Sequence, residues 1–80
     1  MPNTPSDIAE KIALVVKTRR KFLGLSQEEL AHSANIDRTY ASQIERAIAN
    51  PSLSVLCSLA SMLELTLSQL IGEAAIEQHK

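Results

Sequence analysis

Apolar residues recur along this chain at intervals of three and four positions, which is the spacing of residues on one face of an α-helix. Alternation of apolar and polar residues, the mark of a half-buried strand, is almost absent. The pattern predicts five helices, at about residues 5–23, 27–34, 38–48, 53–63 and 67–71. We therefore expect an all-α fold, a five-helix bundle forming one domain over residues 1–80. Its core spans about 5–71, and 72–80 form a tail or a helical extension.

Capping residues set the boundaries of the second and third predicted helices. Ser26 is a good N-cap, and Glu29 completes a capping box, so a helix begins at Gln27. Asn35 accepts a left-handed backbone and allows a sharp turn, after which Asp37 caps the next helix. The segment therefore predicts two short helices joined by a tight turn.

The same kinds of signal bound the other helices. Thr4 caps the first helix and Gly24 ends it. Ser52 caps the fourth helix and Thr66 the fifth, which Gly72 is expected to interrupt.

The third predicted helix has one apolar and one polar face. Its inner face consists of Ala41, Ile44 and Ile48, which we expect in the core. Its outer face carries only hydrogen-bonding side chains, namely Arg38, Thr39, Ser42, Gln43 and Arg46. Tyr40 lies on the flank, where its ring either packs against the turn or faces outward. Such a helix suits the major groove of DNA, whose base edges present donors and acceptors.

The residues of these two helices resemble a known family. The runs LSQEELA (25–31) and DRTYASQIER (37–46) are similar to the helix-turn-helix of phage repressor and Cro proteins, in the class named for the xenobiotic response element. The resemblance covers about residues 12–71, and DRTY-x-S-x-IER is typical of the controller proteins of restriction-modification systems. It implies a repressor-like DNA-binding domain that regulates transcription as a homodimer on a palindromic operator, with RNA polymerase as a further partner.

Two alternatives remain open at this point. The resemblance also fits a phage-type repressor or an antitoxin-like protein that represses its own operon. The residues alone also allow a protein-interaction adaptor, although an adaptor would show apolar anchors where the third helix is polar.

Four residues of the third helix are assigned to base reading: Arg38, Thr39, Tyr40 and Gln43. A guanidinium at the first exposed position can donate two hydrogen bonds to O6 and N7 of guanine. A threonine can bond a base edge or pack its methyl group on thymine, and a glutamine suits adenine. The resemblance to controller proteins turns Tyr40 toward DNA.

Five residues are assigned to the DNA backbone: Gln27, Ser42, Arg46, Asn50 and Ser52. The resemblance implies that Gln27 braces the first residue of the recognition helix and touches a phosphate. Ser42 has an alternative, because a helical serine can bond back to its own backbone. The resemblance also implies a structural ion pair between Arg20 and Glu45 that locks the first helix to the recognition helix.

Charge is distributed unevenly along the chain. The net charge is −1, which taken alone speaks against a nucleic-acid partner. Residues 11–46, however, hold seven lysines and arginines against four acidic residues. The positive charge therefore coincides with the helix-turn-helix, and we expect a modest attraction to phosphate.

The last two helices carry more apolar residues than one small bundle needs. Two apolar stripes follow the fourth helix. The first, expected to pack inward, consists of Leu53, Leu56, Ala60 and Leu63, and the second consists of Val55, Leu59 and Met62. Burial between two copies is the simplest remedy for an exposed apolar patch, and we expect Leu67, Leu70 and Ile71 at the dimer contact. The alternative is that several of these residues cover other helices of the same chain.

Other classes of function find little support. Cys57, the single cysteine, fits a cytoplasmic protein without disulfides and is expected in the core. His32 and His79 lack metal-ligand spacing and are expected on the surface. No catalytic set, cofactor motif, signal peptide or membrane-length apolar stretch appears, so we expect neither an enzyme nor a cofactor. The resembled family usually has glycine where this chain has Ala47. Either this position has a left-handed backbone, at a cost of about 1 kcal/mol for alanine, or the third helix runs one residue further, which is what we expect.

Overall fold

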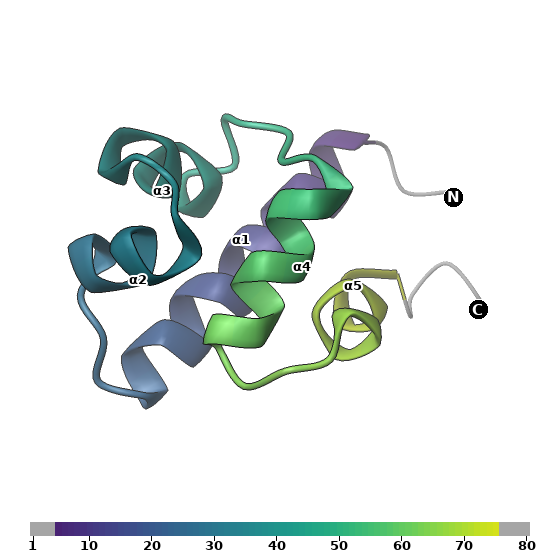
Figure 1. Cartoon of the computed structure of the whole chain (residues 1–80). Coiled ribbons are helices and arrows are strands. Elements are labelled where there is room, and N and C mark those ends of the chain that lie inside the picture. The colour runs from purple at the N-terminus through teal and green to yellow at the C-terminus, as the bar shows by residue number, and fades with distance from the viewer. Residues whose placement is uncertain (1–4, 76–80) are drawn as a thin grey trace.

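The computed structural model describes the backbone of residues 5–75 and the side chains of residues 7–71. This part of the chain contains five helices and no strand, so the predicted all-α fold is confirmed (Figure 1). The helices are α1 (Pro5–Phe22), α2 (Gln27–Ala34), α3 (Arg38–Glu45), α4 (Leu53–Met62) and α5 (Leu67–Ala75).

The helices pack in a closed ring of neighbours. α1 packs against α3 and α5, α2 packs against α3 and α4, and α4 packs against α5. In Figure 1, α2 and α3 therefore lie together on one side of the molecule and α5 on the other. The side chains at the centre are aliphatic and almost wholly buried, namely Val16, Leu30, Ile44, Leu59, Leu63 and Leu70.

Side-chain hydrogen bonds cap the N-termini of three helices, α2, α4 and α5. The predicted capping box of α2 is confirmed, since Ser26 Oγ accepts from the Glu29 amide at 3.0 Å and Glu29 Oε1 accepts from the Ser26 amide at 2.7 Å. Ser52 caps α4 as predicted. Thr66 caps α5, where Gln69 closes a second capping box that the sequence analysis had not identified.

Two further predictions concerned the residues that cap α3 and α1. Asp37 occupies the N-cap position of α3, but its side chain makes no capping hydrogen bond. Thr4, the predicted cap of α1, lies outside the described residues.

A residue with a left-handed backbone follows each of the helices α1 to α4. Gly24 (φ 73°) follows α1 and Asn35 (φ 60°) follows α2, as predicted. Ala47 also has φ 60°, so the prediction that α3 runs through it is wrong. The amides of Ile48 and Ala49 both bond back to the Gln43 carbonyl, at 2.9 and 3.2 Å, and this closure needs the left-handed turn at Ala47.

The early end of α3 also changes which residues are buried. Ile48 lies beyond the turn and is 59% exposed, so its predicted place in the core is wrong. On α4, Leu53 is 63% exposed and Cys57 is exposed, against the prediction for both. Leu59, from the second stripe, is buried instead, because that face of α4 turns toward α2 and α5.

α5 continues further than the sequence indicated. It passes through Gly72 and is described as far as Ala75, so the predicted interruption is wrong. Glycine inside a helix costs about 1 kcal/mol relative to alanine, which weakens a helix without breaking it. None of the helices in the described part of the chain is long and apolar enough to cross a membrane.

Candidate nucleic-acid interface

The start of α2 and the outer face of α3 enclose a shallow, open hollow of about 610 Å³. The hollow gathers six of the nine residues predicted to contact DNA. Together with Asp37, the residues that line it are Gln27, Arg38, Thr39, Ser42, Gln43 and Arg46.

The side chains around the hollow differ in exposure according to their place on α3. Arg38 and Thr39, in the first turn, are exposed, and so is Arg46 at the helix end. Ser42 and Gln43 lie between them and are half-buried. The opposite face of α3 is buried against α1 and α2. α3 therefore presents a continuous surface of donors and acceptors.

The other three predicted DNA contacts lie apart from the hollow. Tyr40 is half-buried and packs against the hydrophobic core, which is the first of the two placements considered for it. Asn50 is exposed and lines a separate depression between α1 and α4. Ser52 is exposed, and its hydroxyl oxygen accepts from the Val55 amide at 3.2 Å.

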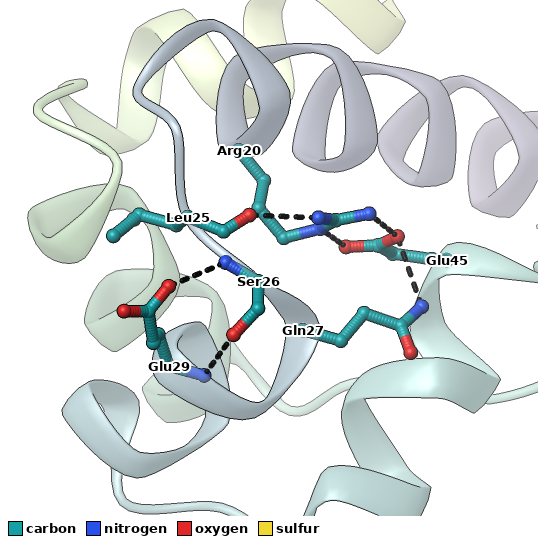
Figure 2. Close-up of polar contacts among 6 residues, drawn as sticks. All are labelled: Arg20, Leu25, Ser26, Gln27, Glu29 and Glu45. Atoms are coloured by element: carbon teal, nitrogen blue, oxygen red, sulfur yellow. Dashed lines mark hydrogen bonds and ion pairs between the residues drawn. The ribbon is translucent and has the colours of Figure 1, made fainter.

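Beneath the hollow, Arg20 and Glu45 form a bidentate ion pair (Figure 2). Arg20 Nε donates to Glu45 Oε2 at 2.6 Å, and Arg20 Nη2 donates to Glu45 Oε1 at 3.0 Å. Arg20 Nη1 also donates to the Leu25 carbonyl at 2.8 Å. The two residues are only 9% and 8% exposed, so α1, the α1–α2 turn and the end of α3 are joined inside the protein. Parallel charge-assisted bonds of this kind fix orientation as well as distance.

Gln27 extends this network to the surface. Its side-chain nitrogen Nε2 donates a hydrogen bond to Glu45 Oε1 at 3.1 Å, as the dashed line between the two residues in Figure 2 marks. The resemblance had implied that Gln27 braces Arg38, and the structure instead shows its amide bonded to Glu45. No sequence signal predicts this contact, because the two residues are 18 positions apart on different helices.

The charges at the hollow are mixed. Two guanidinium groups, from Arg38 and Arg46, share it with the carboxylate of Asp37. Such a surface attracts phosphate moderately and depends on directed hydrogen bonds for its selectivity. Within the described residues, no group of three potential metal ligands gathers at this or any other place.

The residues predicted at a dimer contact do not share one environment. Leu70 is 0% exposed in the single chain, so its prediction as a contact residue is wrong. It is buried because α5 packs against both α1 and α4. Leu67 and Ile71 are half-buried and remain partly accessible. His32 is exposed, and His79 lies outside the described residues.

Comparison with known proteins relates the chain to one family. A helix-turn-helix family model matches residues 16–70. The immunity repressor protein of Bacillus phage phi105 is 41% identical over 61 residues, which cover 76% of this chain and 42% of the repressor. The control protein C.SmaI of Serratia marcescens is 34% identical over 74 residues, which cover 92% of this chain and 88% of that protein.

A solved structure also matches. The wild-type restriction-modification controller protein C.Esp1396I superposes with a TM-score of 0.75 at 33% sequence identity. The match covers 90% of this chain and 91% of the controller chain.

Proposed function

The chain belongs to the helix-turn-helix family of transcription regulators, and from this premise we propose that it is a sequence-specific DNA-binding regulator of the restriction-modification controller type. The observation that carries the proposal is the polar hollow between α2 and α3, which offers hydrogen-bonding groups at the exposed face of a short helix. The kinship with one control protein and with a solved controller supports the narrower assignment. The phage repressor relative supports autorepression as the second candidate.

In this proposal the start of α3 reads bases. Arg38, Thr39 and Gln43 face the major groove, with Tyr40 at their flank. Gln27, Ser42 and Arg46 hold phosphates at the edges of the hollow, and Asn50 and Ser52 extend the backbone contacts toward α4.

We further propose that two copies bind a palindromic operator, because a two-fold symmetric protein presents two recognition helices to two half-sites. Leu67 and Ile71, which one chain covers only in part, are the residues proposed for the contact. The dimer acts in the cytoplasm, where it meets the operator and RNA polymerase.

Base reading can be separated from phosphate binding with two arginine variants. The operator is first selected from a pool of random duplexes, and affinities are then measured on operator and scrambled DNA at several salt concentrations. Arg38→Ala should cost about 1–3 kcal/mol on the operator and little on scrambled DNA. Arg46→Ala should weaken both alike and reduce the salt dependence by about one phosphate contact per subunit. Equal losses on both duplexes for Arg38→Ala would remove it from base reading.

The dimer is tested by sedimentation. The wild-type protein should sediment as a dimer, and Ile71→Glu should give monomers that bind the operator far more weakly. Ile48→Glu is the matched control for sedimentation, because Ile48 is already exposed and lies outside the proposed contact, and this variant should remain a dimer. A wild-type chain that stays monomeric at high concentration contradicts the dimer but not the DNA-binding role.

A further inference from the structure

The bond between Gln27 and Glu45 fixes the orientation of the Gln27 side-chain amide. Glu45 Oε1 also accepts from Arg20 Nη2, so this carboxylate already serves as an ion-pair acceptor. A carboxylate in that role has no hydrogen to donate, and only the nitrogen end of a glutamine amide can bond to it. Of the two flipped orientations of the amide, the one with nitrogen toward Glu45 is therefore the one that forms a bond. Figure 2 shows the amide oxygen turned away from Glu45.

The same amide nitrogen has a second N–H that Glu45 does not use. An amide nitrogen carries two hydrogens, and the structure shows one bond from Gln27 Nε2. Gln27 is half-buried and lines the polar hollow beside Arg46 and Ser42. Its nitrogen can thus donate inward to the ion pair and outward to a group that enters the hollow.

We propose that Glu45 is a positioning residue for DNA binding: it holds the Gln27 amide so that the second N–H donates to a phosphate of the DNA backbone. This inference rests on the proposed DNA-binding function and extends it to a buried residue that DNA does not touch. A phosphate oxygen only accepts hydrogen bonds, as does Glu45, so one amide nitrogen satisfies both partners. Because Gln27 is already ordered before DNA arrives, it loses little rotamer freedom on binding.

The ion pair is what makes this positioning effective. Arg20 holds Glu45 by two bonds and the α1–α2 turn by a third. The carboxylate therefore has a fixed position relative to the start of α2, where Gln27 lies. Without it, Gln27 would be a mobile side chain on an exposed helix start.

A double-mutant cycle separates positioning from a purely structural role. Gln27→Met keeps the length of the side chain and removes both N–H groups, and should weaken operator and scrambled DNA alike. Glu45→Gln should weaken DNA binding about two- to tenfold in the wild-type background. In the Gln27→Met background it should cause no further weakening of DNA binding, whereas it should lower the melting temperature in both backgrounds, because the ion pair with Arg20 is lost in each. Additive losses of affinity would overturn the proposal.

A second measurement uses the wild-type protein, in case Glu45→Gln does not fold. In the NMR spectrum of the free protein, one side-chain amide proton of Gln27 should be shifted downfield by Glu45. The other should move only when operator DNA is added. If α3 backbone amides shift on DNA addition but neither Gln27 proton does, the positioning role is wrong while the DNA-binding function stands. If no resonance responds to any duplex, the proposed function itself fails.

Discussion

Arg19 and Arg20 are neighbours on α1, yet they bond to opposite halves of the molecule and in different ways. Arg20 is buried and makes two bonds to the Glu45 carboxylate on α3. Arg19 is half-buried, donates one bond to the Leu63 carbonyl at the end of α4 at 2.9 Å, and lies 5.0 Å from the centre of the Phe22 ring. The bonds of Arg20 thus join the helix-turn-helix half to α1 through a charged network. The bond of Arg19 joins the α4–α5 half to α1 through a neutral carbonyl, beside apolar packing.

The difference follows from what each half has to do. A surface that selects DNA by hydrogen bonds needs side chains held in defined directions, and ion pairs with two parallel bonds supply direction. The α4–α5 half buries Leu59, Leu63 and Leu70, whose packing is tight but not directional. Stability can come from either half, whereas the geometry of the hollow depends on the charged one.

The largest expected effect is that of Arg20→Met. Removing one partner of a buried ion pair leaves the other charge unmatched, so the free energy of unfolding should fall by about 3–5 kcal/mol. Arg19→Met is the matched control and should cost about 1 kcal/mol or less, because Arg19 is partly solvated and bonds a neutral carbonyl. Urea unfolding of both variants provides the measurement. Similar losses for the two would erase the contrast between the halves.

Leu63→Ala tests the apolar half. Leu63 is wholly buried, and its truncation should lower the free energy of unfolding by about 2–5 kcal/mol. Under conditions where the variant remains folded, its DNA affinity should equal that of the wild type. The Leu63 side chain is apolar and makes no hydrogen bond to the residues that line the hollow. A change in operator affinity per folded molecule would show that the two halves are coupled.

Local sequence signals predicted the parts of the fold that depend on a few neighbouring residues. The capping box at Ser26 and the left-handed turn at Asn35 each involve bonds within five residues, and both were predicted. The orientation of α4 was not predicted fully, because both of its faces carry apolar residues and only packing against α2 and α5 selects between them. For this reason Leu53 and Cys57 are exposed while Leu59 is buried.

The hollow was predictable to the extent that helical periodicity determines it. Five of its predicted residues lie on the outer face of α3, and Gln27 follows from the adjoining helix start. The bond from Gln27 to Glu45 depends on how α2 meets the end of α3, which no periodicity encodes. Tyr40 lay on the boundary between two faces, so its sequence position allowed either placement.

The two halves of the molecule resemble each other in one respect, because α3 and α4 are both followed by a non-glycine residue with a left-handed backbone. Ala47 (φ 60°) and Glu64 (φ 61°) both adopt a left-handed conformation that favours glycine. Ala47→Gly and Glu64→Gly should therefore each raise the free energy of unfolding by about 1 kcal/mol. Ala49→Gly, at a residue without positive φ, should be neutral or destabilising. Thermal melts compare the three variants, and a loss of stability in Ala47→Gly would mean that its methyl group matters more than its backbone strain.

The smallest expected effect separates the two capping boxes, one in each half. The box of α2 uses the carboxylate of Glu29, and the box of α5 uses the neutral amide of Gln69. The Ser26 backbone N–H, and then the Ser26 hydroxyl, hold the pKa of Glu29 below its ordinary value of 4.5. A carboxyl group whose pKa is lowered by folding stabilises the protein above its unfolded pKa and loses that contribution as the pH falls through the folded pKa.

Glu29→Gln gives α2 the same kind of capping box as α5. The unfolding free energy of this variant should therefore depend less on pH than that of the wild type, from pH 4.5 downward. Urea titrations of both proteins at neutral pH and at several values below 4.5 measure this, with Gln69→Glu as the reciprocal variant that should gain the same pH dependence. Identical pH profiles for wild type and Glu29→Gln would show that the α2 box does not titrate with folding.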